Sequence, residues 1–263
     1  MDLGLHGKRC IVTGASDGIG AATARVLAAE GASVGLVARR RDRLDAVAAE
    51  CAAAGAPVTS VAAADLRDAE ALATAFASLT DTLGGVDVLV NNAGDSKLGT
   101  LEALDDSAWQ ESFELKLMGY VRGMRFVLPL MRAQRAGCIV NILGTAGTHP
   151  SPTYVLSCFV TALAQLTASV ADEVAPDGVR VVGLGPGYTS TERVMGTVRR
   201  LAGEAGRPVE EFVTEFGRRV VPIGRLATAE EMARLVAVLA SDRVSGFVTG
   251  TQLIADGGAS RSI

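Results

Sequence analysis

Short apolar runs rich in Val and Ile alternate with helix-like segments along nearly the whole chain. The first run, Arg9 to Thr13, precedes an Ala-rich helical stretch at Gly18 to Ala29, and Ser33 to Ala38 precedes an amphipathic segment at about 41–54. Strands and helices joined by such short connections predict a parallel sheet covered by helices on both faces. This alternation constrains the fold more than any other feature of the sequence.

The alternation continues along most of the chain. Further strands are expected at Pro57–Ala63, Val86–Asn91, Cys138–Leu143 and Val179–Leu184, with helices at about 68–83, 106–133 and 153–175. No internal repeat, low-complexity tract or linker interrupts the pattern, so a single α/β domain over residues 1–263 is predicted. A charged helical segment at about 190–219 departs from the pattern. It is interpreted either as a lid over a substrate site or as a solvated helical excursion.

Composition narrows the functional classes. With 49% hydrophobic residues in 263 and a net charge of −4, the chain can bury a large core and has no long basic run for nucleic acid or an anionic membrane. The apolar runs are short and interrupted, so no membrane helix and no signal peptide are expected. Four widely separated cysteines without C-x-x-C spacing predict buried, reduced thiols in a cytoplasmic protein, and no metal site is expected.

A glycine-rich segment lies where the first strand passes into the first helix. It reads Thr13-Gly14-Ala15-Ser16-Asp17-Gly18-Ile19-Gly20. Gly14 allows a tight turn, Gly18 lets a pyrophosphate approach the backbone, and Gly20 permits close packing of helix on sheet. The helix N-terminus adds free N–H groups and a positive dipole. The strand before the segment and the helix after it indicate a dinucleotide-binding loop rather than a simple turn.

The spacing Gly-x-x-x-Gly-x-Gly resembles that of the short-chain dehydrogenase/reductase family, and further motifs follow in that family's order. They are Asn91-Asn92-Ala93-Gly94, Tyr154 with Ser157, Pro186-Gly187 with Thr189 and Thr191, and Gly250-Thr251-Gln252 with Asp256-Gly257-Gly258. The resemblance covers essentially the whole chain. It implies a Rossmann-type doubly wound fold and a nicotinamide cofactor. It also implies a homotetramer or homodimer built on the helices at about 106–133 and 153–175.

The end of the second strand favours NADP(H) over NAD(H). An NAD site usually has a carboxylate there, whereas this chain has Ala38 followed by Arg39 and Arg40. Arg39 can form a bidentate pair with a 2′-phosphate; alternatively, both arginines only solvate the start of a helix. The resemblance adds Asp65, at the position that binds the adenine amino group. The expected cofactor-binding residues are Gly14, Ser16, Asp17, Gly18, Ile19, Gly20, Arg39, Arg40, Asp65, Leu66, Asn92, Ala93, Gly94, Tyr154, Pro186, Gly187, Thr189 and Thr191.

The catalytic part of the resemblance is incomplete. In the family a Tyr acts as acid and base, a Lys four residues later favours its ionised form, a Ser holds the substrate oxygen and an Asn fixes a relay water. Here Tyr154 is kept, but Cys158 stands at the Lys position, Gly144 at the Ser position and Lys116 at the Asn position. Thr145 offers a hydroxyl one residue beyond the Ser position, and the loop from there to the Tyr is a few residues short.

Lys116 stands in an otherwise apolar helical segment, where an ammonium is costly without a partner. We hypothesise that it replaces the missing positive charge near Tyr154. Alternatively, it reaches solvent or pairs with Glu111 or Glu114. Cys158 is interpreted as a space-filling thiol rather than as a nucleophile. His149 is interpreted as a surface loop residue or as a substrate contact.

Three functions are compatible with these residues. The first is NADP(H)-dependent interconversion of a small carbonyl compound and its alcohol. Tyr154 would then be the acid and base, Lys116 would act on it electrostatically, and Thr145 would contact the substrate oxygen. Without help from Lys116, reduction should exceed oxidation, because only oxidation needs the phenolate. The second is a cofactor-binding homologue without turnover, acting as a sensor or oligomer partner. The third is non-redox chemistry, such as elimination, with the cofactor in a structural role.

Overall fold

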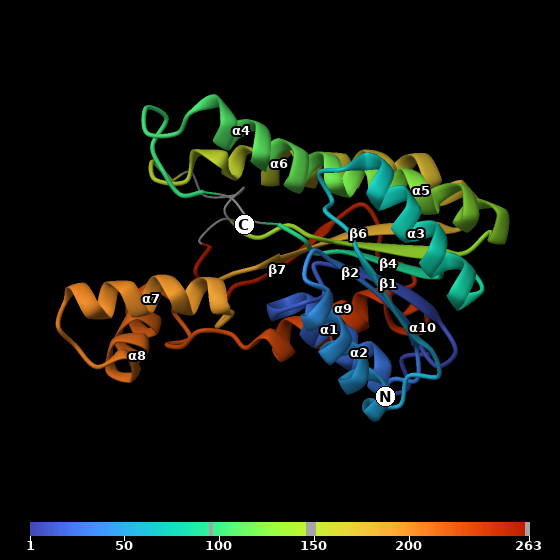
Figure 1. Ribbon diagram of the computed structural model, residues 1–263, viewed down its shortest axis with the longest axis horizontal. Helices are drawn as coiled ribbons and strands as arrows, with labels where there is room; N and C mark the ends of the chain where they lie inside the picture. Colours follow the sequence, from blue (N-terminus) through green and yellow to red (C-terminus); the bar gives the residue numbers. More distant parts are fainter. Residues whose placement is uncertain (95–96, 146–150, 261–263) are drawn as a thin grey trace.

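A seven-stranded parallel sheet in the order β3-β2-β1-β4-β5-β6-β7 forms the centre of the molecule (Figure 1). The computed structural model describes residues 1–94, 97–145 and 151–260. The strand order reverses between β1 and β4, which is the switch point of a doubly wound sheet. The strands are β1 Arg9–Thr13, β2 Ser33–Ala38, β3 Thr59–Ala63, β4 Val88–Asn91, β5 Gly137–Ile142, β6 Val179–Pro186 and β7 Gln252–Ala255.

Helices cover both faces of this sheet. Helices α1, α2 and α9 lie on one face and α3, α5 and α6 on the other (Figure 1). The predicted single doubly wound α/β domain is therefore confirmed. The helices are α1 Gly18–Ala29, α2 Arg41–Ala54, α3 Ala69–Leu83, α4 Asp106–Ser112, α5 Gly119–Gln134, α6 Cys158–Val174, α7 Glu192–Glu204, α8 Val209–Val220, α9 Ala229–Ala240 and α10 Asp242–Ser245.

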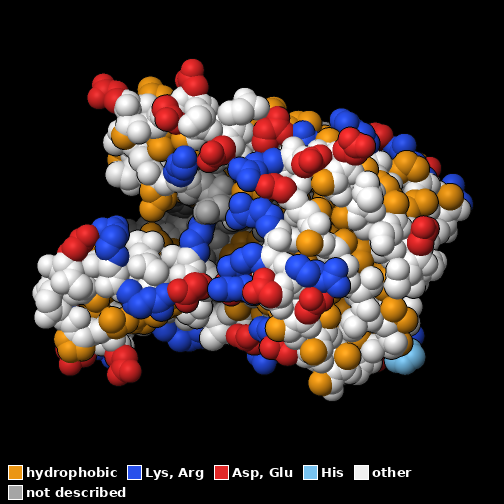
Figure 2. Space-filling view, in the orientation of Figure 1, with side chains coloured by type: hydrophobic (Ala, Val, Ile, Leu, Met, Phe, Trp, Pro, Cys, Tyr) orange, Lys and Arg blue, Asp and Glu red, His pale blue; other side chains and the backbone are white. Residues whose placement is uncertain are grey.

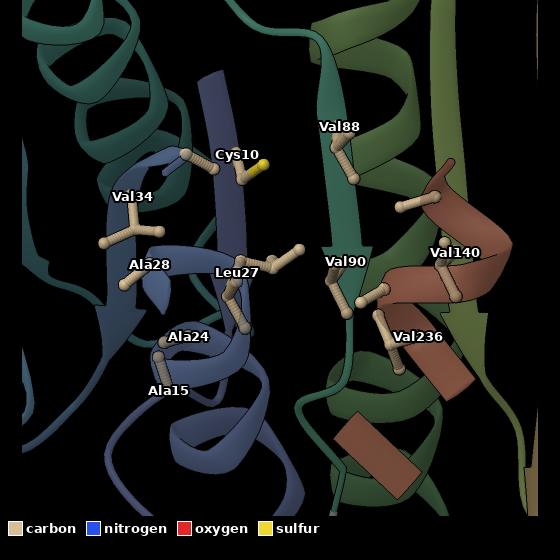
Figure 3. Close-up of a cluster of buried hydrophobic side chains, with 14 of the residues drawn as sticks. Cys10, Ala15, Ala24, Leu27, Ala28, Val34, Val88, Val90, Val140 and Val236 are labelled. Carbon is tan, nitrogen blue, oxygen red and sulfur yellow. The ribbon is translucent and has the colours of Figure 1, made fainter. Parts of the chain in front are cut away.

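Each face of the sheet packs its own apolar layer. On the α1 and α9 side, Leu27, Val90 and Val236 are fully buried, and Figure 3 shows side chains from strands and helices pointing into this layer. On the other side, Phe76 and Met124 pack over Ile139. Strands buried on both faces need continuous β-branched and aliphatic runs, which these strands have. The rigid sheet then fixes the loops that follow its strands.

Two of the predicted helices are wrong in detail. The helix expected at 106–133 is interrupted, because Phe113–Met118 form a π-helical segment (η1) between α4 and α5. The helix expected at 153–175 begins only at Cys158, after a 3₁₀ turn at Val155–Ser157. Apolar periodicity near 3.6 residues does not reveal one wider turn. Such π-helical segments are frequent at functional sites, and η1 contains Lys116.

The charged segment at about 190–219 contains α7 and α8, which stand away from the sheet as a helical pair (Figure 1). Backbone hydrogen bonds join its base: Ser190 N–H donates to Ala227 O at 2.8 Å, and Ala227 N–H donates to Tyr188 O at 2.9 Å. Tyr188 also packs edge-to-face on Phe216 of α8, with ring centroids 5.5 Å apart. The role of this pair as a lid stays a prediction.

Helix α6 is more apolar than the sequence analysis recognised. With its flanking turns, Val155–Asp177 is long and apolar enough to span a membrane by composition, with a mean hydropathy of 1.5. Its buried side, which includes Leu163, Ala171 and Val174, packs in the fold, the last two in the same layer as Val181 of β6. We therefore describe α6 as a core helix of the α/β layers.

Candidate active site

The motif residues gather along one edge of the sheet. Because the strands are parallel, their carboxyl ends lie along the same edge, and Gly14, Asn92, Gly144 and Gly187 follow the ends of β1, β4, β5 and β6 within two residues. Figure 2 shows a hollow between the α4–α6 side and the α7–α8 pair, with Lys and Arg side chains gathered around its mouth. A doubly wound sheet binds its ligands in such a place.

The glycine loop packs tightly against the end of β4. Gly14 and Gly18 have φ angles of +64° and +53°, which favour glycine. A Cβ atom on Gly20 would overlap the carbonyl oxygen of Gly14 and lie 2.5 Å from Nδ2 of Asn92. That Nδ2 donates to the carbonyl oxygens of Thr13 and Gly14 at 3.1 and 3.3 Å. The Asn-Asn-Ala-Gly motif thus fixes the loop, and the buried Ala93 adds a bond from its N–H to Thr13 Oγ1.

The N-terminus of α1 opens onto the same loop. Asp17 Oδ1 accepts a hydrogen bond from Gly18 N–H at 2.7 Å, while the next N–H groups of the first turn lack a helical acceptor. Such a terminus attracts anions. Arg40 donates to Ser16 Oγ at 3.3 Å, and Arg43 pairs with Asp17 at 3.2 Å. Arg40, just before α2, and Arg43, in its first turn, therefore both contact the glycine loop.

The adenosine end holds one open arginine. Arg39 is exposed and makes no hydrogen bond or ion pair within residues 1–94, 97–145 and 151–260. Asp65 accepts from Arg67 at 2.6 Å, and this bond holds the pKa of Asp65 below its usual value. Leu66 is buried in the core layer, and its carbonyl accepts from Arg122. Arg39 is therefore available to an incoming phosphate, whereas Asp65 is tied to Arg67.

The segment after β6 lies over the glycine loop. Pro186 ends the strand, and the buried Thr189 donates its Oγ1 to Gly187 O at 3.1 Å. A Cβ atom on Gly18 would lie 3.1 Å from Cγ2 of Thr191. The two motifs, far apart in sequence, thus face each other across the loop.

Lys116 points from the π-helical segment to the end of β5. Its Nζ donates to Ile142 O at 2.8 Å and to Tyr120 Oη at 3.1 Å. A Cβ atom on Gly94 would lie 3.0 Å from this Nζ, so the amine lies directly over the Asn-Asn-Ala-Gly motif. Burial, and next the charge of Arg193, lower the pKa of Lys116 to about 7.

No carboxylate pairs with Lys116 in the described part of the chain. Glu114 pairs with Arg122 at 2.6 Å, and Glu111 with Lys97 at 3.4 Å. The alternative in which Lys116 pairs with Glu111 or Glu114 is therefore wrong, because both carboxylates are taken by other cations. The amine does not reach out to solvent either, since its hydrogen bonds end on oxygens at the end of β5 and on α5.

Tyr154 is held by its backbone at the start of the turn before α6. Its N–H donates to Ser151 O at 3.1 Å, its carbonyl accepts from Ser157 N–H at 3.0 Å, and it forms a β-bridge with Gly99. Its side chain is partly exposed and makes no hydrogen bond to any described residue, Lys116 included. The phenol is therefore open to a ligand. An electrostatic effect of Lys116 on this phenol stays a proposal.

The backbone and the exposure of the positions that depart from the expected motif differ from one position to the next. Gly144 has a φ of +96° and open space around its Cβ position, a conformation that a Ser rarely adopts. Thr145 is partly buried beside it. Cys158 is exposed, which corrects the expectation of a buried thiol: it opens α6 on the outer side of that helix. Partial burial still raises the pKa of this thiol, and His149 lies outside the described residues.

Sequence reasoning missed two residues of this site. Tyr120 is fully buried, its Oη donates to Ile142 O at 2.8 Å, and the Lys116 amine lies 4.8 Å from its ring centroid. Its position four residues after Lys116 is a signal that the two share a helix face. The positive charge of Arg193, in the first turn of α7, contributes to the lowered pKa of Lys116, and Arg193 has no comparable signal in the sequence.

Comparison with known proteins agrees with this geometry. The family model described as short chain dehydrogenase matches residues 8–201. The chain belongs to the short-chain dehydrogenase family. It is 38% identical over 252 residues to cis-4-hydroxycyclohexanecarboxylate dehydrogenase of Sinomonas cyclohexanicum, covering 94% of each chain. It is also 35% identical over 267 residues to the uncharacterized oxidoreductase YvrD of Bacillus subtilis, covering 100% of each.

Solved structures of this family share the whole fold. L-sorbose reductase from Gluconobacter frateurii, complexed with NADPH and L-sorbose, matches with a TM-score of 0.95 and 31% identity over 100% of both chains. Membership of the short-chain dehydrogenase family confirms the expected resemblance and places the protein in an oxidoreductase family whose members act on small molecules. The tightly packed glycine loop, the anion-attracting helix terminus and the open Arg39 also fit a phosphorylated dinucleotide.

Proposed function

We propose that this short-chain dehydrogenase is an NADP(H)-dependent oxidoreductase that interconverts a carbonyl and an alcohol group. The arrangement at the strand ends carries the proposal: a glycine loop fixed by Asn92, an open Arg39 and an unengaged Tyr154 phenol lie along one edge of the sheet. Support comes from the L-sorbose reductase complex with NADPH and from the Sinomonas cyclohexanicum relative, whose name specifies an alcohol substrate.

The cofactor would be held by groups that are already in place. The loop at 14–20 would hold the pyrophosphate, Arg39 and Arg40 the 2′-phosphate, and the segments 92–94 and 186–191 the nicotinamide end. When bound, this cofactor supplies or accepts the hydride. The protein therefore contributes orientation and charge, which is its usual share in such reactions.

Cofactor choice is tested at Arg39. An Arg39→Met variant should bind NADPH about 10-fold more weakly and NADH about equally, because only NADPH has the 2′-phosphate. Arg41→Met is the matched control, since Arg41 pairs with Asp45 on the surface of α2 at 2.9 Å. Titration of cofactor fluorescence measures both constants. Equal weakening of NADPH and NADH binding in Arg39→Met would argue against the proposed phosphate contact.

Tyr154 would donate a proton to the substrate oxygen during reduction and remove it during oxidation. Its fixed backbone and unengaged phenol suit this role. Lys116 would add positive charge at this end of the cleft, and the Thr145 hydroxyl would contact the substrate oxygen. With a pKa of about 7, Lys116 is charged in only part of the molecules at neutral pH. Alcohol oxidation, which needs the tyrosinate, should accordingly be slower than reduction.

The experiment that tests this function is NADPH oxidation with a panel of diketones, quinones and 3-oxoacyl thioesters. Tyr154→Phe should lower turnover by about 100-fold or more, while NADPH binding remains within a factor of two or so of the wild-type value. Full turnover in Tyr154→Phe would remove Tyr154 from the mechanism.

A cofactor-binding homologue without turnover is the second candidate. It is favoured by the exposed Cys158 at the Lys position, by the left-handed Gly144 at the Ser position, and by the hydrogen bonds of Lys116, none of which reaches Tyr154. Tight NADPH binding without turnover of any carbonyl in the panel would favour this candidate over the oxidoreductase.

A further inference from the structure

The side chain of Gln252, the first residue of β7, reaches across a neighbouring strand to the end of β5. Its Nε2 donates to the carbonyl oxygen of Gly144 at 3.2 Å, although β6 lies between β5 and β7 in the sheet. Because a carbonyl oxygen only accepts hydrogen bonds, the amide must turn its nitrogen toward Gly144. Gln252 therefore ties the last strand of the sheet to the end of a strand two places away.

Two glycines of β6, Gly183 and Gly185, leave the space through which this side chain passes. A Cβ atom on Gly185 would lie 2.4 Å from Nε2 of Gln252 and 3.3 Å from the oxygen of Gly144. A Cβ atom on Gly183 would lie 3.4 Å from Cβ and Cγ of Gln252. Residues two apart in a strand face the same side of a sheet. A side chain at position 185 would therefore displace the amide from Gly144.

The bond replaces a contact that the backbone of β6 does not provide. The ladder between β5 and β6 extends to Leu143, whose N–H donates to Leu184 O at 2.7 Å. Pro186, which ends β6, has no N–H with which to continue it. The chain then turns at Gly144, whose φ of +96° is left-handed. A side-chain donor from β7 thus holds the first peptide after the end of the ladder.

The peptide held in this way belongs to the reacting end of the cleft. Two residues before Gly144, the carbonyl of Ile142 accepts from Lys116 at 2.8 Å. Directly after Gly144 comes Thr145, whose hydroxyl is proposed to contact the substrate oxygen. Side chains from η1 and from β7 therefore fix the end of β5 from two different elements.

We propose that Gln252 is a positioning residue for the proposed reaction. Holding the oxygen of Gly144 orients the whole planar peptide that joins Gly144 to Thr145. It thereby sets the place at which the Thr145 hydroxyl meets the substrate oxygen. Gln252 acts through Gly144 and Thr145. The inference rests on the proposed function for the effect on turnover, but not for the hold on the end of β5.

Amide hydrogen exchange, followed by NMR, tests the hold on β5 without any turnover. Gln252→Met keeps the length of the side chain but has no N–H. The Leu143 amide should therefore exchange about 10-fold faster in this variant, as for the loss of one neutral hydrogen bond. The Cys138 amide begins the same strand, donates to Asp87 O at 2.9 Å, and should be unchanged. Unchanged exchange at Leu143 would overturn the inference.

Gln165→Met is the matched control for this variant. Gln165 is exposed on α6, where its Nε2 donates to Ser169 Oγ at 3.5 Å. Its replacement should leave exchange at Leu143 and Cys138 as in the wild-type protein. Equal acceleration at Leu143 in Gln165→Met and Gln252→Met would mean that the bond to Gly144 is not the cause.

Gly185→Ala tests the same bond from the side of β6. Its methyl group should push the amide away from Gly144 and accelerate exchange at Leu143 about 10-fold, as Gln252→Ala should. Because both changes remove one bond, the double variant should also show about 10-fold acceleration, not about 100-fold. Multiplied effects would mean that the two residues act on β5 independently, which contradicts the path inferred for Gln252.

Turnover distinguishes failure of this inference from failure of the proposed function. For the reduction of 2,3-butanedione by NADPH, kcat should fall about 10-fold in Gln252→Met and stay unchanged in Gln165→Met. The Kd of NADPH should remain within a factor of about two, because the cofactor loop is held elsewhere. Faster exchange at Leu143 with an unchanged kcat would overturn the positioning role. No reduction of any carbonyl in the panel, together with faster exchange at Leu143, would remove the oxidoreductase and keep the hold of Gln252 on β5.

Discussion

The cofactor end of the cleft, around Gly14 and Asn92, is fixed by close backbone packing and by a short side-chain amide, whereas the reacting end, around Lys116, depends on one long side chain. At the first, Asn92 bonds carbonyl oxygens of the loop, and a Cβ atom on Gly20 would overlap backbone. At the second, a lysine reaches across to Tyr120 and Ile142.

This difference explains where the chain keeps its family motif and where it departs from it. A position that must lack a side chain, or that must bond a backbone carbonyl, has few substitutes. A charge or a hydroxyl, by contrast, can be supplied by a neighbouring residue whose side chain reaches the same place. The three expected departures at catalytic positions, Lys116, Gly144 and Cys158, all fall at the reacting end. The fold therefore preserves the cofactor loop more strictly than the reacting groups.

The strongest test of this comparison is Gly20→Ala. The added Cβ would meet the carbonyl of Gly14 and the amide of Asn92, so the loop or the helix must shift. We expect a loss of about 3 kcal/mol in the free energy of unfolding, as for overpacked cores, together with loss of NADPH binding. Urea unfolding and cofactor titration measure the two effects.

Gly203→Ala in α7 is the control for this variant. Nothing lies within 4 Å of its Cβ position, so the change should be neutral or stabilising by up to about 1 kcal/mol through helix propensity. A Gly20→Ala variant as stable as Gly203→Ala, with normal NADPH binding, would contradict the idea that the backbone fixes this end.

Lys116→Met tests the reacting end through the pH dependence of stability. The pKa of Lys116 is 10.5 in the unfolded chain and about 7 in the fold, so between these values the unfolded chain binds more protons. Raising the pH through this window therefore increases the stability of the wild-type fold. At pH 7 we expect Lys116→Met to be more stable than wild type by about 2 kcal/mol, with the difference shrinking toward pH 10.

Urea unfolding at pH 7, 8.5 and 10 measures this difference. Lys8→Met is the control, because Lys8 makes only a surface pair with Asp242 at 3.7 Å and should change stability by less than about 1 kcal/mol. A stability difference between wild type and Lys116→Met that stays constant over this pH range would mean that the fold does not lower the pKa of Lys116, so that the amine is charged in the fold as it is in the unfolded chain.

The cofactor end could be predicted from the sequence almost residue by residue. The strand Arg9–Thr13 and the helix Gly18–Ala29 agree with the structure in both bounds, because a β-branched run, a glycine turn and an alanine-rich run are local signals. The glycines of the loop were recognisable for the same reason, since their backbone angles and close contacts exclude other residues.

The reacting end could be predicted only in part. Lys116 was noticed as a charge in an apolar segment, but its partner Ile142 lies 26 residues away and no local pattern joins them. The influence of Arg193 on the pKa of Lys116 depends on where α7 lies in the fold, which no local pattern shows. Cys158 was expected to be buried because Phe159 and Val160 follow it, yet a helix with apolar residues on several sides does not reveal which side faces outward.

Gly144→Ser should have the smallest effect of the three variants. It introduces the Ser that the sequence resemblance expects at this position, and open space surrounds the Cβ site, so no clash is expected. The φ of +96° alone is unfavourable for Ser, which should lower the free energy of unfolding by about 1 kcal/mol. Because the backbone there differs from one that presents a Ser side chain to the substrate, turnover of any accepted carbonyl should not rise.

Gly203→Ser, with open space and an ordinary helical conformation, is the control. A clear gain in kcat for Gly144→Ser would mean that this backbone does accommodate a catalytic serine, and that the reacting end has lost only a side chain.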